Sequence, residues 1–248
     1  MLSFRAHCDR DLRRWTLDQN ENGMKKDFVQ DRRAGDSRGD IIFALFGHAT
    51  IGLEWNGKHV YVDPCCSEAD FTTLPKADAI LITHHHDDHF DPEAVEMLRK
   101  SDTVIIANAV VAAELEGAES LGESNRTFMN SWLAVERVPA YNIERTQYHP
   151  KERGDNGYII EMAGRRTYVG GDTELTPEMR AVEGIDYLFL PVNLPYTMTV
   201  EMAVEAAKSI KPRIFYPFHT IGTPPEEIAR IPLLLAEEDM EVVVAPME

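Results

Sequence analysis

The sequence predicts an α/β (α+β) fold in which two β-sheets pack face to face between helices, a four-layer αββα sandwich. In the first half, β-type runs follow one another as hairpins, and Asn56-Gly57 between the runs 51–55 and 58–62 is typical of a type I′ turn. In the second half, β-type and helical segments alternate up to the C-terminus. A chain of 248 residues with 44% hydrophobic content is long enough to bury such a core as one domain.

The first 39 residues differ in character from the rest. Charged side chains interrupt every hydrophobic start there, so we expect residues 1–39 to form a charged N-terminal extension, with a short helix around 12–17, and residues 40–248 to form the folded domain. No apolar stretch has the length of a signal-peptide core or of a membrane span.

The predicted elements of the first half begin at residue 41. Strands are expected at 41–46, 51–55, 58–62 and 79–82. Asp91-Pro92-Glu93 combines an N-cap, a proline at the first helical position and an acidic first turn, which predicts a helix to about residue 99. A strand at 103–107 and a helix near 110–116 follow, whereas 119–130 shows little pattern.

The second half begins with a strand at about 132–138 and a long loop to residue 156. A strand pair at 158–162 and 166–169, a helix at 177–182 and a strand at 186–190 follow. Thr199 predicts the start of a helix at 200–210. A strand at 213–218, a helix at about 226–235 and a strand at 241–245 complete the order.

The segment Thr83 to His89 carries the strongest functional signal. It places four histidines and two aspartates in seven residues directly after the strand 79–82. Side chains alternate in an extended segment, so His84 and His86 project to the same side, and after a turn Asp88 and His89 can reach a second position nearby. Imidazole and carboxylate groups at these offsets predict two metal positions.

Three further strand ends carry polar residues with two interpretations each. His48 lies at a Gly-His break between strands, where it either enters a cleft or caps a turn. Asp63 is either an Asx-turn residue or a carboxylate that fixes the tautomer of a metal-bound histidine. Asp172 follows two glycines, which let the backbone approach a metal centre closely; the alternative is an ordinary turn aspartate.

The composition indicates which partners and which cellular compartment to expect. The net charge of −17 disfavours nucleic acid and anionic membrane surfaces as partners, so a small-molecule substrate is expected, and nothing indicates the oligomeric state. The three cysteines, Cys8, Cys65 and Cys66, do not form a disulfide framework, which suits a reducing compartment and predicts a cytoplasmic protein.

The pattern H-x-H-x-D-H, filled by His84, His86, Asp88 and His89, resembles the signature of the metallo-β-lactamase-fold hydrolases. The resemblance extends from about residue 40 to the C-terminus and is greatest to a lactonase-like branch, whose relatives include ascorbate-phosphate lactonases and N-acyl-phosphatidylethanolamine phospholipases D. The segments that carry it are Gly47-His48, Val62-Asp63-Pro64, Thr83 to His89, Val138 to Asn142, His149-Pro150-Lys151, Gly171-Asp172-Thr173, Leu190-Pro191, Pro195 to Thr199 and Tyr216 to His219.

This resemblance implies a metallo-β-lactamase-like hydrolase domain with a binuclear metal site at one sheet edge. The implied ligands are His84, His86 and a third donor for one metal, and Asp88, His89 and His219 for the other, with Asp172 bridging. Many superfamily members have a histidine where this chain has Asn142. We favour His149 as the third donor, with Asn142 as the alternative, because imidazole is a better ligand for Zn²⁺ than a carboxamide.

A set of histidines and carboxylates suits two Zn²⁺ ions, although Mn²⁺ or Fe²⁺ would accept it too. We therefore expect a metal-dependent hydrolase in which a metal-bridging hydroxide attacks a small ester, lactone or phosphodiester. The residues expected to act in catalysis are Asp88, Asp172, Tyr196 and His48. The Tyr196 phenol either donates to a developing oxyanion or only packs.

Three other functions compete with hydrolysis of a small molecule. The alternative that stays open is a metal-binding or partner module of the same fold without turnover. A nuclease is disfavoured because the chain lacks a basic groove and room for a substrate-clamping domain. A di-iron oxidoreductase is disfavoured because such relatives typically carry a glutamate at the position of His86.

Overall fold

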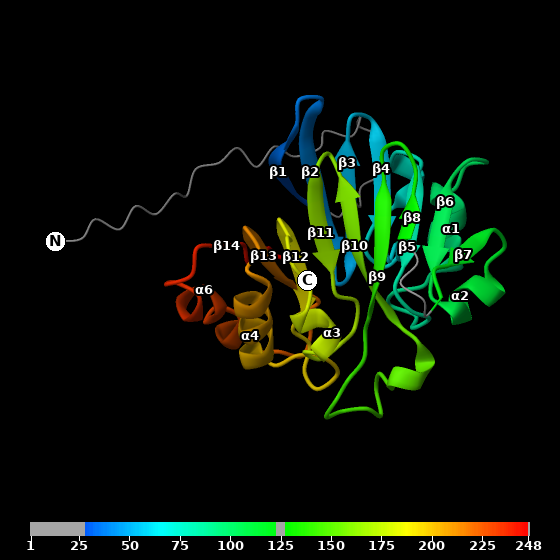
Figure 1. Ribbon diagram of the computed structural model, residues 1–248. Coiled ribbons are helices and arrows are strands. Elements are labelled where there is room, and N and C mark those ends of the chain that lie inside the picture. Colours follow the sequence, from blue (N-terminus) through cyan, green and yellow to red (C-terminus); the bar gives the residue numbers. More distant parts are fainter. Residues whose placement is uncertain (1–27, 123–126, 248) are drawn as a thin grey trace.

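The computed structural model describes residues 28–122 and 127–247. Within these residues two seven-stranded sheets face each other, with helices against their outer faces (Figure 1). The strand order is β1-β2-β3-β4-β5-β6-β7 in the first sheet and β14-β13-β12-β11-β10-β9-β8 in the second. The predicted four-layer αββα sandwich is confirmed.

The first sheet and its helices come from the first half of the chain. Their bounds are β1 (Val29–Asp36), β2 (Gly39–Gly47), β3 (Thr50–Trp55), β4 (Lys58–Val62), η1 (Phe71–Thr73), β5 (Ala79–Ile82), α1 (Pro92–Leu98), β6 (Val104–Ala107), α2 (Ala109–Glu114) and β7 (Ala118–Ser120). Asn56 and Gly57 have φ angles of 50° and 73°, which is the type I′ turn that the sequence predicts between β3 and β4. Asp91 caps α1 as predicted, because its side chain accepts from Glu93 N and Ala94 N.

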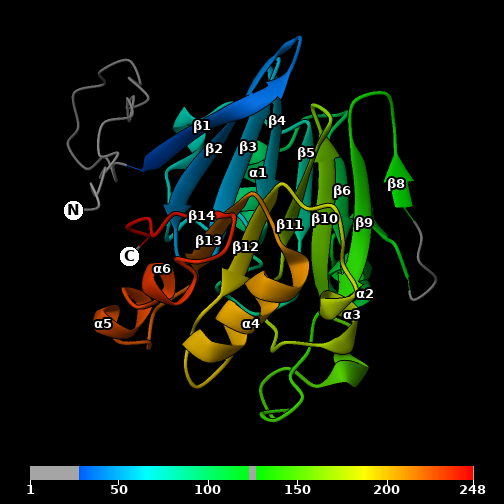
Figure 2. The same cartoon turned by 60° about the vertical axis from the view of Figure 1, so that its left-hand side comes forward.

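The second sheet and its helices follow. Their bounds are β8 (Thr127–Met129), β9 (Ala134–Pro139), η2 (Lys151–Arg153), β10 (Asn156–Met162), β11 (Arg165–Val169), α3 (Pro177–Arg180), β12 (Tyr187–Pro191), α4 (Val200–Ile210), β13 (Ile214–Phe218), α5 (Pro225–Ile228), α6 (Ile231–Leu234) and β14 (Glu241–Val242). Thr199 caps α4 as predicted. Figure 2 shows α4, α5 and α6 together on one side of this sheet.

Three apolar clusters hold the layers together. The central cluster fills the space between the sheets, where the rings of Phe189 and Tyr216 stack at 4.4 Å and Phe43 packs against both. A second cluster joins α3 and α4 to the second sheet, and a third joins α1 and α2 to the first. Burial of these side chains is the main driving force that brings the two halves of the chain together.

Strand direction decides where the polar loops lie. The first sheet pairs β4, β5 and β6 in parallel, and the second pairs β11, β12 and β13 in parallel. Their carboxyl ends therefore lie at one edge of each sheet. Two backbone hydrogen bonds join these edges, from Asn156 N to Thr83 O at 3.0 Å and from His219 N to His48 O at 3.2 Å. The loops of both halves consequently meet at one end of the sandwich.

The structure corrects three predicted elements. Strand β1 lies inside the segment 1–39 that was predicted as an extension, and it pairs antiparallel with β2. Strands β7 and β8 lie in the stretch 119–130 or at its start, where the sequence shows little pattern. The last predicted helix is two short ones, since Pro232 has no N–H to continue α5 into α6.

Two further expectations concern the ends of the chain and the membrane. The helix predicted around 12–17 lies outside the described residues. Among the helices of the described residues, none has the length and apolar character needed to cross a membrane.

Candidate metal centre

The segment Thr83 to His89 begins where the buried strand β5 ends. It lies at the end of the sandwich where the loops of the two sheets meet. Three residues around it, His48, Asp63 and His219, have left-handed backbone conformations with φ of 44°, 48° and 48°. Such conformations are costly for residues other than glycine and concentrate at functional sites. Gly171 also has a positive φ of 63°, and a Cβ there would lie 2.5 Å from Asn156 O. The backbone before Asp172 therefore lies close to that of Asn156, and its approach to a metal stays a prediction.

The first group of candidate ligands consists of His84, His86, His149 and Asp172, whose ligand atoms all lie within 4.8 Å of one another. His84 Nε2 lies 3.1 Å from His86 Nδ1, so the two imidazoles face the same point as the alternation in the sequence predicts. His149 Nε2 lies 3.3 Å from Asp172 Oδ2. The group joins a loop of the first sheet to two loops of the second.

The second group consists of His89, Asp172 and His219, and Asp88 lies beside it. Asp172 Oδ1 lies 3.4 Å from His89 Nε2 and 3.3 Å from His219 Nε2. Asp88 Oδ2 lies 3.7 Å and 3.6 Å from the same two nitrogens. One buried carboxylate therefore presents Oδ2 to the first group and Oδ1 to the second.

The described residues leave Asp172 Oδ1 buried without a hydrogen-bond partner. An orphaned carboxylate oxygen in a buried site is costly unless something else satisfies it. The surrounding imidazole nitrogens and carboxylates are the donor set that Zn²⁺, Mn²⁺ and Fe²⁺ accept, and they fit two divalent ions.

His48 enters the site rather than only capping its turn. Its Nε2 lies 2.9 Å from Asp88 Oδ2, and its ring centroid lies 3.9 Å from that of His219. Asp88 is partly exposed, with 45% of its side chain accessible, so this contact holds the carboxylate that faces the solvent.

Hydrogen bonds also fix the outer nitrogens of the imidazoles. Asp63 is buried and accepts from His89 Nδ1 at 2.8 Å, from Thr83 N at 2.8 Å and from Thr83 Oγ1 at 2.7 Å. This is the contact that the tautomer-fixing interpretation of Asp63 requires, and it leaves His89 Nε2 free to face the centre. Thr83 Oγ1 also lies 2.9 Å from His84 Nδ1.

Two residues that contact the candidate ligands were not predicted from the sequence. Arg153 lies with Nη1 2.9 Å from His86 Nε2 and Nη2 2.7 Å from His149 Nδ1, and its Nε donates to Asp155 at 2.7 Å. Asn193 lies with its amide 3.1 Å from His219 Nδ1. Neither forms a local motif with its histidine, because Arg153 and His86 are 67 positions apart and Asn193 and His219 are 26 apart. The sequence therefore holds no signal for these contacts.

Burial and charge set the protonation of the centre. Burial, followed by the charge of His89, holds the pKa of His84 well below its usual value. Burial and then Arg153 lower the pKa of His86 to about 4, and burial lowers the pKa of His219. These imidazoles are consequently neutral near pH 7, which is the form that binds metal.

The carboxylates of the centre are kept in their charged form. Burial alone would raise the pKa of Asp172, but His219 and His89 hold it well below its usual range. For Asp88, burial is likewise outweighed by the hydrogen bond from His48 and the charge of His89, and its pKa is lowered. His89 is the exception among the imidazoles, because Asp172 and Asp63 flank it and raise its pKa against the effect of burial.

His149 is a member of the first group. Asn142 is buried beside it and donates from Nδ2 to Arg145 O at 3.1 Å and to Tyr196 O at 2.7 Å, whereas its Oδ1 has no hydrogen-bond partner among the described residues. Its backbone N–H donates to His149 O at 2.8 Å. Asn142 thus holds together the loop that carries His149.

Tyr196 lies next to Asn142, which donates to its backbone oxygen. The Tyr196 side chain is exposed, and its ring packs edge-on against that of Tyr148 at a centroid distance of 4.9 Å. Cys65 and Cys66 lie outside the ligand groups found among the described residues, and burial raises the pKa of both thiols, that of Cys66 to about 12.

Comparisons with known proteins show which family the chain is similar to. Residues 43–219 match the family model described as the β-lactamase superfamily domain. A UPF0173 metal-dependent hydrolase of Flavobacterium johnsoniae is 31% identical over 194 residues, which cover 72% of this chain and 84% of that protein.

Solved structures extend the comparison. A crystal structure from Parabacteroides distasonis, described as that of a metal-dependent hydrolase, is 39% identical with a TM-score of 0.83, and the match covers 89% of this chain and all of that one. A metallo-β-lactamase fold protein of Bacillus subtilis is 14% identical with a TM-score of 0.64, over 80% of this chain and 88% of that one, and this likeness concerns the fold alone.

Proposed function

Because this chain belongs to the metallo-β-lactamase superfamily, and within it to the UPF0173 metal-dependent hydrolases, we propose that it is a di-metal hydrolase of a small ester, lactone or phosphodiester. The observation that carries this proposal is the buried Asp172 carboxylate, which faces one imidazole group with Oδ2 and another with Oδ1. A carboxylate shared in this way is the arrangement expected of a ligand that bridges two ions.

In this proposal each group of side chains has a defined task. His84, His86 and His149 hold one ion, and Asp88, His89 and His219 hold the other. Two divalent ions held here, of which Zn²⁺ is the best match, would lower the pKa of a shared water and supply the hydroxide nucleophile. The neutral forms of His84, His86 and His219 favour metal binding at pH 7 without competition from protons.

The remaining residues position the site or contact the substrate. Asp63 and Thr83 orient the imidazoles of His89 and His84, and His48 orients Asp88. Tyr196 lies at the rim with its phenol able to donate to the oxygen that becomes negative when the carbonyl or phosphoryl centre is attacked.

Two finer assignments belong to the same proposal. The lactonase-like branch is supported by the segments around His149 and Tyr196. A cytoplasmic location is supported by the small number of cysteines.

Elemental analysis and a substrate panel test the proposal. We expect close to two divalent ions per chain after incubation with Zn²⁺ or Mn²⁺, and turnover of at least one member of an ester, lactone and phosphodiester panel. His86→Ala should abolish turnover while circular dichroism stays near that of the wild type. Protein that takes up no ion would refute the centre. Two bound ions without turnover on the whole panel would favour a metal-binding module instead.

A further inference from the structure

The side chains around the centre offer little positive charge to an anionic substrate. The loops at 64–70, 83–91, 170–176, 192–199 and 219–224 contain no lysine or arginine. The loop 140–155 contains three, and each is held by a carboxylate: Arg145 by Glu174 at 2.7 Å, Lys151 by Glu178 at 2.9 Å and Arg153 by Asp155 at 2.7 Å. A phosphoryl group would therefore find no uncommitted cation among the side chains of these loops.

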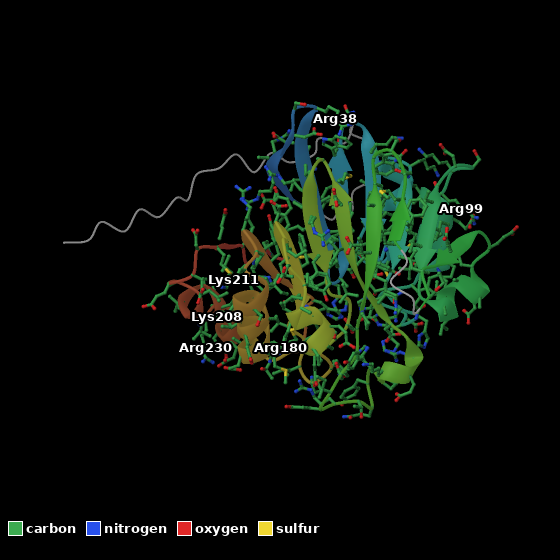
Figure 3. The ribbon with its side chains drawn as sticks, viewed as in Figure 1. Arg38, Arg99, Arg180, Lys208, Lys211 and Arg230 are labelled. Atoms are coloured by element: carbon green, nitrogen blue, oxygen red, sulfur yellow. The ribbon has the colours of Figure 1, made fainter. Side chains whose placement is uncertain are left out.

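Several other cations of the described residues lie elsewhere. Figure 3 shows Arg38 at the far end of the β1–β2 pair and Arg99 beyond α1. It also shows Arg180, Lys208, Lys211 and Arg230 along the helical layer of the second sheet. Negative charge is accessible beside the centre, since Asp87 is exposed, and the exposed Lys151 is paired with Glu178.

Apolar side chains occupy the same loops. Ile143, Tyr196 and Ile221, which we call the apolar rim, are exposed by 50%, 46% and 52% although large hydrophobic side chains are normally buried. Each lies within a few residues of a side chain in or beside the centre: Ile143 follows Asn142, which lies beside the first ligand group, Tyr196 lies three positions after Asn193, which contacts His219, and Ile221 lies two positions after His219.

Hydrogen bonds tie these three loops together. Asn142 Nδ2 donates to Tyr196 O at 2.7 Å, and Leu194 N donates to Thr223 Oγ1 at 3.1 Å. Gly222 approaches Leu194 so closely that a Cβ on Gly222 would lie 2.4 Å from Leu194 O. These contacts hold the three loops that carry the apolar rim next to one another, beside the centre.

We infer that the substrate is an uncharged carboxylic ester or lactone whose acyl chain is apolar and lies against the apolar rim. This inference rests on the proposed function and selects among its three substrate types. Water adds to the acyl carbon, the acyl C–O bond breaks, and one proton of the water passes to the alkoxy oxygen that leaves. An ester gives an alcohol and a carboxylic acid, and a lactone gives a single hydroxy acid; in each case the acid loses its proton near neutral pH and is then repelled by the exposed Asp87.

A chain-length series tests the inference. With metal-loaded protein we expect kcat/KM to rise from p-nitrophenyl acetate to the butyrate and the hexanoate, by about two- to fourfold per methylene that leaves water. Bis(p-nitrophenyl) phosphate should be a poorer substrate than any of the esters. Rates are corrected for hydrolysis in the absence of protein.

Variants of the rim separate its contribution from general hydrophobicity. Ile221→Ser and Ile143→Ser should flatten the series at unchanged metal content. Leu233→Ser is the matched control, because Leu233 is 76% exposed on α6, outside the loops of the centre. A flat series in the wild type, or equal flattening by Leu233→Ser, overturns the inference.

The two proposals fail differently. Faster turnover of the phosphodiester than of every ester overturns the inference and leaves the di-metal hydrolase in place. Metal-loaded protein that turns over neither class overturns both.

Discussion

Asp63→Asn tests how the centre is prepared for metal. Asp63 accepts three hydrogen bonds, two from Thr83 and one from His89 Nδ1. Asparagine tolerates the left-handed backbone at this position, where φ is 48°, so the main chain is expected to keep its course. The amide has only one acceptor oxygen, however, and its NH₂ group would face a donor.

The substitution is expected to change the tautomer of His89. With an NH₂ group beside Nδ1, the imidazole favours the tautomer whose proton is on Nε2, the nitrogen that faces the centre. Loss of such an outer partner typically lowers metal affinity by about 10- to 100-fold, which corresponds to about 1.4–2.7 kcal/mol. The ion held by His89 should be lost first, so the variant should retain close to one ion at chelator concentrations where the wild type retains two.

The assay is a competition titration with a chromophoric chelator, combined with elemental analysis. Asp70→Asn is the matched control, because Asp70 also accepts from a threonine N–H and hydroxyl, those of Thr72, but is exposed and caps η1, with no imidazole among its hydrogen-bond partners in the described residues. The reasoning is refuted if folded Asp63→Asn binds both ions as tightly as the wild type, or if Asp70→Asn loses as much affinity.

Three further predictions address the bridge, the third ligand and the far edge of the first sheet. Asp172→Asn should weaken both ions and lower kcat more than KM, and a variant with full metal content and unchanged kcat would exclude the bridging role. His149→Ala should lower the affinity of the first ion by about 10- to 100-fold or more, whereas Asn142→Ala should do much less; the reverse order in the chelator titration would contradict the assignment. Asp78 accepts from Lys58 and Lys100 at 2.8 Å, and although burial opposes it, these contacts lower the pKa of Asp78. The contribution of Asp78 to the free energy of unfolding is therefore present above about pH 4, which is the pKa of an aspartate in the unfolded chain. It is lost as the pH falls through the lower pKa that Asp78 has in the folded state. Urea unfolding should accordingly show Asp78→Asn less stable by about 1–2 kcal/mol at pH 6, with a difference that shrinks as the pH falls below about 4; a difference that grows on acidification would contradict it.

The sequence by itself determined the features that depend on neighbours along the chain. The turn at Asn56-Gly57 and the helix caps at Asp91 and Thr199 follow from backbone preferences of a few adjacent residues. The convergence of His84 and His86 follows from strand alternation in the same way. The family resemblance added the pairing of distant ligands, which spacing alone does not supply.

Tertiary structure decided what depends on where separate loops come to rest. Strand β1 is held by pairing with β2 although its own charged sequence predicts no strand, because the context of a sheet outweighs local preference. The position of His149 depends on how the loop 140–155 folds back towards His84, which follows β5. The contact of Arg153 with His86 exists because loops of both sheets meet at one end of the sandwich, and that of Asn193 with His219 exists because β12 and β13 are neighbouring parallel strands. The preferences of neighbouring residues determine the local conformation of each ligand segment, and the packing of the two sheets determines which segments meet.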